Sequence, residues 1–258
     1  MKTSRVTTVR WRFGIASDIG DRAEQQDRAA IVESSDGDDY LVAVADGMGG
    51  YQGGALAAQA VIDAATPFFE TAIVSDPLSS LGALCSEAHR AIVQIGEHGE
   101  QSPGSTCVLL YLSADEACWV HVGDSRLYHF RKKRLVTRTL DHSMAQVLVS
   151  RGETAETEIA DSPLQNQLYM RLGGTQEPDP EFGAAEVQPG DLFMLCSDGF
   201  WASVDPQEVA AVMSEDDLQA AAERLVQLAK ERAGSGGDNI TVAMAQLRRQ
   251  PRKFRLFP

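Results

Sequence analysis

The sequence YLVAVADGMGG, residues 40–50, joins a run of apolar residues to an acidic, glycine-rich turn. Tyr40 to Ala45 are aromatic, β-branched or small apolar residues, and this composition predicts a short buried strand. Asp46 and Gly47 follow directly, so the strand should end in a carboxylate at a tight turn. A single Asp-Gly pair is ordinary turn chemistry, and its meaning depends on whether the arrangement recurs.

The arrangement recurs at three further places in the chain. Aspartate stands at the end or the start of a strand-like run in the pairs Asp124-Ser125, Asp198-Gly199 and Asp238-Asn239. In a chain of net charge −14, such carboxylates repel one another unless a cation binds between them. Hard oxygen ligands without a Cys or His cluster favour Mg²⁺ or Mn²⁺ over zinc. These residues therefore indicate a site for divalent metal ions.

One arginine accompanies the acidic residues in the early part of the chain. Arg22 precedes Asp27 by five residues. A guanidinium can hold two oxygens of a phosphoryl group in a planar fork, so an arginine beside a carboxylate–metal cluster indicates a phosphate ester as the substrate. The alternative is a salt bridge from Arg22 to Asp18 or Asp21.

Short apolar runs bounded by Gly, Asp or Ser predict many strands and few long helices. The predicted strands are residues 12–16, 40–45, 105–112, 117–122, 126–130, 192–196 and 240–247. Apolar residues at helical spacing predict helices at residues 54–69, 78–95 and 216–230. Strands in runs with helices grouped between them predict an α+β fold with separate layers, not a regular βαβ alternation.

Length and composition fit one folded domain. The 258 residues are 43% hydrophobic and 23% charged, and no Pro/Ser-rich linker or internal repeat divides them. We predict a domain over residues 1–247 and a basic C-terminal tail over residues 248–258, interpreted as a disordered end in preference to a docking segment for an acidic partner. The acidic segment 151–161 should be an exposed helix end and loop.

Net charge and hydropathy limit the classes of binding partner. The excess of negative charge argues against nucleic acid and membrane surfaces as partners. No window approaches the ~18 apolar residues of a spanning helix, and the first 14 residues lack the apolar core of a signal peptide, which predicts a cytoplasmic protein. The cysteines lack CxxC spacing and predict buried free thiols over a disulfide or zinc site; they are Cys85, Cys107, Cys118 and Cys196.

The acidic and glycine-rich motifs, taken in chain order, match a known family. They are Gly20-x-Arg22-(x)4-Asp27, Val44-Ala45-Asp46-Gly47-Met48-Gly49-Gly50, Gly104-Ser105-Thr106, Val122-Gly123-Asp124-Ser125-Arg126, Asp141-His142-Ser143, Leu195-Cys196-Ser197-Asp198-Gly199 and Gly237-Asp238-Asn239-Ile240-Thr241-Val242. The set extends over residues 17–242. It resembles the PP2C (PPM) family of metal-dependent protein serine/threonine phosphatases, and the bacterial branch fits best.

The resemblance implies a four-layer sandwich of two antiparallel β-sheets flanked by α-helices. It also implies two Mn²⁺ or Mg²⁺ ions in a cleft at one end of the sheets. Asp46 would bridge both ions, and the Gly47 carbonyl oxygen would bind one of them. Asp198 and Asp238 would complete the coordination of the first ion, and Asp27 would act directly or through water near the second.

The resemblance further implies a mechanism, in which Arg22 would hold the non-bridging phosphate oxygens while hydroxide attacks phosphorus in line. Asp124 matches the aspartate that holds a third, weaker ion in bacterial members, and residues 143–174 match the mobile flap over the cleft. Met48 stands where eukaryotic members carry a histidine often assigned as the general acid. His142 is the obvious substitute, although a structural role at the base of the flap is the favoured interpretation.

Two features depart from the family pattern. Family members commonly carry Asn and Glu or Gln before the first aspartate, and the pair here is Gln25-Gln26, which predicts modest affinity for the second ion. The motif from Gly20 to Arg22 is one residue shorter than in many bacterial relatives. A cysteine phosphatase is rejected, because residues 196–202 lack the arginine of the phosphate-binding CxxxxxR loop.

The predicted function is hydrolysis of phosphoserine and phosphothreonine on proteins, opposite a cognate Ser/Thr kinase. One alternative is a catalytically weak module that binds phosphoproteins, and the retention of Arg22, Asp46, Asp198 and Asp238 argues against it. The other alternative is a hydrolase of small phosphate esters, whose cleft chemistry would be identical.

Overall fold

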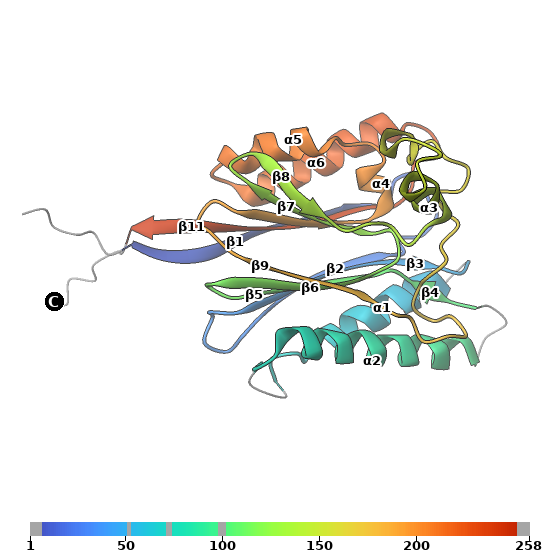
Figure 1. Cartoon of the computed structure of the whole chain (residues 1–258), viewed down its shortest axis with the longest axis horizontal. Helices are drawn as coiled ribbons and strands as arrows, with labels where there is room; N and C mark the ends of the chain where they lie inside the picture. Colours follow the sequence, from blue (N-terminus) through green and yellow to red (C-terminus); the bar gives the residue numbers. More distant parts are fainter. Residues whose placement is uncertain (1–6, 51–52, 71–73, 98–101, 252–258) are drawn as a thin grey trace, which may run out of the picture.

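Two antiparallel β-sheets face each other, and helices cover the outer face of each sheet (Figure 1). The computed structural model describes residues 7–50, 53–70, 74–97 and 102–251. The layers confirm the α+β sandwich that the sequence predicts.

The first sheet contains the first and the last strands of the described residues. Its strand order is β1-β11-β10-β7-β8. Strands β1 (Thr7–Asp18) and β11 (Ile240–Pro251) pair over 12 residues each. The other strands are β10 (Leu192–Cys196), β7 (Arg126–Arg131) and β8 (Arg134–Arg138), and the covering helices are α5 (Pro206–Ala211) and α6 (Leu218–Ala233).

The second sheet has the order β2-β3-β5-β6-β9, and the short strand β4 pairs with β3. Its strands are β2 (Asp27–Glu33), β3 (Tyr40–Met48), β4 (Gly104–Ser105), β5 (Cys107–Leu112), β6 (Glu116–Val122) and β9 (Glu181–Glu186). Helices α1 (Gly53–Ala65) and α2 (Pro77–Glu97) cover its outer face (Figure 1).

Strand β3 shows why the central strands are continuous apolar runs. Val42 and Val44 lie in the hydrophobic cluster between the two sheets. Leu41, Ala43 and Ala45 point the opposite way, into the cluster that includes α1 and α2. A strand that is covered on both faces loses the apolar–polar alternation of a half-exposed strand.

Three strands and three short helices of the described residues were not predicted from the sequence. Strands β2, β8 and β9 carry charged residues at both ends, and most of β8 and β9 is at least partly exposed, so none gives a continuous apolar run. Helices α3 (Met144–Ser150), α4 (Asp198–Trp201) and α5 have at most seven residues, too few for a helical repeat.

Strand β11 continues past the predicted domain boundary at residue 247, which corrects the predicted tail. Residues 248–251 pair with β1, and residues 252–258 lie outside the described residues. Arg248 interrupts the apolar run, but its guanidinium is held by the carbonyl oxygens of Met213 at 3.0 Å and Glu215 at 3.1 Å.

Several smaller predictions are confirmed. Helix α3 ends at Ser150, and an exposed segment with one 3₁₀ turn (Glu156–Glu158) follows. The four cysteines are buried and free. Within the described ranges, every helix is too short or too polar to cross a bilayer.

Candidate metal and phosphate site

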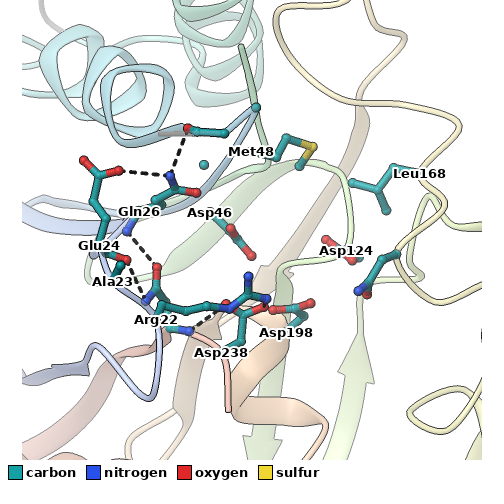
Figure 2. A pocket seen from close by; sticks show the side chains of 15 residues that line it. Arg22, Ala23, Glu24, Gln26, Asp46, Met48, Asp124, Leu168, Asp198 and Asp238 are labelled. Carbon is teal, nitrogen blue, oxygen red and sulfur yellow. Dashed lines mark hydrogen bonds and ion pairs between the residues drawn. The ribbon is translucent and has the colours of Figure 1, made fainter. Parts of the chain in front are cut away.

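A pocket of about 440 Å³ opens at the end of the sandwich where β3 ends and β11 begins (Figure 2). It collects residues from both sheets, from the loop before β2 and from the segment after α3. They are Arg22, Ala23, Glu24, Gln26, Asp46, Gly47, Met48, Gly49, Gly50, Asp124, Asn166, Leu168, Asp198, Asp238 and Asn239. Of the predicted site residues, only Asp27 is absent from this set.

The end of β3 brings Asp46 and Gly47 into the pocket. The Asp46 backbone N–H donates to Thr106 Oγ1, and the Thr106 N–H donates to the Asp46 carbonyl oxygen, both at 2.9 Å. A Cβ on Gly47 would lie 1.9 Å from the carbonyl oxygen of Gly54, so this close approach of β3 to α1 requires glycine. The strand end is therefore fixed from two sides.

Asp198 and Asp238 enter from the first sheet. Asp198 is the first residue of α4, two residues after β10 ends, and Asp238 lies two residues before β11 begins. Asn239 donates its backbone N–H to Asp238 Oδ1 at 2.8 Å. Its side-chain amide donates to the carbonyl oxygens of Ile19 at 2.8 Å and Glu24 at 3.1 Å. Asn239 thus ties the loop before β2 to the turn that carries Asp238.

Arg22 reaches the pocket from that loop. Gly20 adopts a φ of 60°, and a Cβ there would lie 2.2 Å from the Asp238 carbonyl oxygen. Arg22 Nη2 donates to Asp238 Oδ2 at 2.6 Å. The Arg22 side chain is 55% exposed, so the guanidinium remains accessible to a ligand in the pocket.

The two salt bridges considered as alternatives for Arg22 are not the ones observed. Asp18 pairs with Lys230 Nζ at 2.9 Å, and Asp21 accepts the Gly236 backbone N–H at 2.7 Å. Arg22 instead pairs with Asp238, a candidate metal ligand, and this partner lies 216 residues away in the sequence. Only the folded loop brings the two residues together.

Asp27 lies beside the pocket rather than in it. It stands opposite Asp46 in the β2–β3 ladder and is only 3% exposed. Ser197 Oγ donates to Asp27 Oδ2 at 2.7 Å, and Asp27 Oδ1 has no hydrogen-bond partner in the described part of the chain. Asp27 therefore lies behind Asp46, close to the other carboxylates, and does not face the opening of the pocket.

Asp124 faces the other carboxylates from the turn between β6 and β7, and is 4% exposed (Figure 2). Met48 and Leu168 line the pocket near it and offer no proton. Among the described residues, the pocket lining does not include His142, which is buried and accepts the Gly123 N–H at Nδ1 at 3.1 Å. This position fits the structural interpretation of His142.

The carboxylates shift one another's titration. Burial raises the pKa of Asp27 to about 7, and the charges of Asp198 and Asp238 add to the effect. Burial, followed by repulsion from Asp238, raises the pKa of Asp198 to about 6. Burial and neighbouring carboxylates also hold the pKa values of Asp46 and Asp124 well above their usual range. The group cannot ionise fully unless positive charge is added.

The residues present fit a pair of hard divalent cations. The donors are all oxygens, which Mg²⁺ and Mn²⁺ prefer. Within the described residues, Asp27 Oδ1 and Asp198 Oδ1 are buried without a hydrogen-bond partner. Such atoms are rare in folded proteins unless a bound ion or water accounts for them.

Of the pocket residues, Gln26 was singled out from the sequence as a departure from the family pattern, whereas Glu24, Asn166 and Leu168 were not. Gln26 Nε2 donates to Glu24 Oε2 and to the Gly50 carbonyl oxygen, each at 3.2 Å (Figure 2). Asn166 and Leu168 enter from the predicted flap region. Glu24 and Gln26 lie inside the first motif, so their position was a usable signal, whereas the flap residues carry no pattern that predicts where they fold.

Comparison with known proteins gives the class. Residues 16–248 match the family model described as protein phosphatase 2C. The serine/threonine protein phosphatase PstP of Mycobacterium tuberculosis is 31% identical over 231 residues, which are 87% of this chain and 44% of PstP. The protein phosphatase PhpP of Streptococcus pneumoniae is 29% identical over 212 residues, 80% of this chain and 85% of PhpP.

A solved structure agrees with the sequence matches. The catalytic domain of PstP, in complex with two manganese ions, aligns with a TM-score of 0.81 at 29% identity, covering 93% of this chain and 100% of that chain. The chain belongs to the protein phosphatase 2C family. It spans less than half of the full length of PstP and most of the length of PhpP.

Proposed function

We propose that this protein hydrolyses phosphoserine and phosphothreonine on proteins with the help of two Mn²⁺ or Mg²⁺ ions. The observation that carries the proposal is the convergence of four carboxylates and one accessible guanidinium on a single pocket, from Asp46, Asp124, Asp198, Asp238 and Arg22 (Figure 2). The manganese ions bound by the PstP catalytic domain support it.

The chain's own residues divide the task of holding the ions. Asp46 would bind both ions and the Gly47 carbonyl oxygen would bind one of them. Asp198 and Asp238 would complete the ligands of the first ion, and Asp27 would act near the second. When bound, such a pair of ions lowers the pKa of water so that hydroxide is available near neutral pH. Asp124 would hold a third, weaker ion.

Arg22 would orient the substrate. Its guanidinium can bind two phosphoryl oxygens in a planar fork, and its hydrogen bond to Asp238 fixes the side chain beside the carboxylates. Phosphoryl transfer is catalysed mainly by positioning and by electrostatic stabilisation, and a guanidinium that holds phosphorus in line with the attacking oxygen contributes to both. The residue therefore acts on both substrate binding and geometry.

The leaving oxygen of serine needs a proton, and the wall formed by Met48 and Leu168 cannot supply one. His142 is buried away from the pocket lining. Asp124 is the acidic residue on that side of the pocket, so we assign delivery of this proton to a water molecule held beside Asp124.

Phosphoproteins are the proposed substrates, and a Ser/Thr kinase that produces them is the proposed counterpart. The names of PstP and PhpP support this class of substrate over small phosphate esters. The decisive experiment compares turnover of phosphoserine and phosphothreonine peptides with turnover of sugar phosphates, in Mn²⁺ and after chelation. Asp46→Asn is the inactive control. Preference for sugar phosphates would refute the substrate class, and peptide binding without turnover would instead identify a regulatory module.

A further inference from the structure

The backbone around Asp124 is held from two sides by residues outside the pocket. On one side, the His142 N–H donates to the Gly123 carbonyl oxygen at 2.8 Å, and the Gly123 N–H donates to His142 Nδ1 at 3.1 Å. On the other side, Trp201 Nε1–H donates to the Asp124 carbonyl oxygen at 2.8 Å. These three bonds fix the turn from which the Asp124 carboxylate projects.

The two supports are themselves connected. The Arg126 guanidinium carbon lies 3.5 Å from the centroid of the Trp201 ring, a cation–π contact. Arg126 also donates two hydrogen bonds of 2.7 Å to the Asp141 carboxylate, and both of these side chains are buried. Asp141 directly precedes His142 in the chain, so these contacts form a closed ring. We call this set the Asp124 ring: Gly123, Asp124, Arg126, Asp141, His142 and Trp201.

The Asp124 ring reaches a second pocket carboxylate through α4. Asp198 is the first residue of this four-residue helix, and Trp201 is the last. The backbone of α4 fixes these two residues relative to each other, and the Trp201 indole fixes the Asp124 backbone. The separation of Asp198 and Asp124 is thus set by contacts that a ligand in the pocket does not touch.

We propose that His142 and Trp201 are positioning residues that set the place of Asp124 relative to Asp198, and with it the affinity for an ion at Asp124. This rests on the proposed function, since it takes both carboxylates as ligands. Each residue acts through the backbone at Asp124. His142 holds the backbone of Gly123, the residue before Asp124, and Trp201 holds the carbonyl oxygen of Asp124 itself.

A separate metal centre at His142 is the competing explanation. His121, His142 and Glu181 place ligand atoms within 4.8 Å of one another. The Gly123 N–H can only donate, so His142 Nδ1 carries the lone pair, and the neutral ring carries its proton on Nε2. Nε2 lies 3.6 Å from Glu181 Oε1 and is the atom that a metal would need. The hydrogen bond to Gly123 therefore favours the positioning role.

The test uses substitutions that separate the bond from the bulk of the side chain. His142→Leu removes the acceptor, whereas His142→Asn keeps an acceptor near the position of Nδ1. Trp201→Phe removes the indole N–H and keeps an aromatic ring beneath Arg126. Mn²⁺ binding is titrated calorimetrically, and amide hydrogen exchange is followed over residues 122–126.

We expect His142→Leu and Trp201→Phe to weaken the weakest Mn²⁺ step about tenfold while the tighter steps change less than about twofold. Exchange at Gly123 should accelerate in His142→Leu, and His142→Asn should restore most of both properties. The double variant of His142→Leu with Asp124→Asn should bind Mn²⁺ like Asp124→Asn alone, because a residue that acts through another loses its effect when that other is gone.

His89→Leu is the matched control, since His89 is also buried and its Nδ1 accepts the Gly173 N–H at 3.2 Å, away from the Asp124 ring. Equal weakening of all Mn²⁺ steps in His142→Leu and His89→Leu, or additive losses in the double variant, would overturn the proposal. So would zinc that survives dialysis in the parent protein and is lost in His121→Phe. If Asp124→Asn leaves Mn²⁺ binding unchanged, the third-ion assignment fails, and exchange at Gly123 still decides whether His142 holds the turn.

Discussion

Replacing Asp27 by asparagine should stabilise the metal-free protein at pH 8 and leave its stability at pH 4 nearly unchanged. Asp27 is buried, and burial together with its neighbours Asp198 and Asp238 raises its pKa to about 7. In the unfolded chain an aspartate titrates near 3.9, as a rough reference value. The folded protein therefore retains a proton that the unfolded chain releases between these values, and stability falls as pH rises through that window.

The size of the effect follows from the same two values. A difference of about three pH units at about 1.36 kcal/mol each gives about 4 kcal/mol at pH 8. This is an upper value, because removing one charge lets the neighbouring carboxylates ionise more readily. Asparagine removes the charge and keeps an oxygen that can accept the Ser197 hydrogen bond. We therefore expect a gain of about 2–4 kcal/mol in the free energy of unfolding.

The assay is urea unfolding of chelator-treated protein at intervals from pH 4 to pH 8, with and without saturating Mn²⁺. The gain should develop between pH 4 and pH 7 and should disappear when Mn²⁺ supplies the missing positive charge. Asp36→Asn is the control, because Asp36 is exposed and its bond from Ser34 lowers its pKa, so the pH dependence has the opposite sign. A gain equal at pH 4 and pH 8, or no gain at pH 8, would refute the reasoning.

Three further predictions concern the pocket. Asp46→Asn should abolish turnover of phosphopeptides while circular dichroism shows the fold intact, and normal turnover in Mn²⁺ would contradict its bridging role. Arg22→Ala should raise KM and weaken inhibition by inorganic phosphate about 10- to 100-fold, as expected for losing charge-assisted hydrogen bonds; unchanged inhibition would leave Arg22 as a partner of Asp238 only. Asp124→Asn should depress kcat for a phosphoserine peptide more than for p-nitrophenyl phosphate, whose leaving group needs no proton, and equal fractional losses would assign Asp124 to general integrity of the site.

The sequence predicted best where burial imposes a continuous pattern. Strands such as β3 and β10 are covered on both faces, so their apolar runs end visibly at Asp46 and near Asp198. Strand β9 lies at the edge of its sheet with four of its six residues exposed, and its sequence EFGAAE gives no such signal. The candidate site was predictable to the same degree, because its acids stand at strand ends.

Contacts between segments that are distant along the chain could not be predicted from the sequence. The partner of Arg22 is Asp238, although nearer aspartates were available along the chain. Asp27 shares the first motif with Arg22, yet its place in the β2–β3 ladder turns it behind Asp46 and away from the opening. Trp201 carries no motif of its own, and only the geometry of α4 reveals its bond to Asp124.

The pairing of β1 with β11 has a consequence for the biosynthesis of this protein. The first and last described strands are neighbours, and the pocket needs both the loop at Arg22 and the turn at Asp238, two segments separated by nearly the whole chain. Contacts of such long sequence separation form late, because loop closure must be overcome before they stabilise anything. A ribosome-bound chain that has not yet released β11 therefore has neither a closed first sheet nor an assembled pocket, and the pocket becomes available only after β11 has been synthesised.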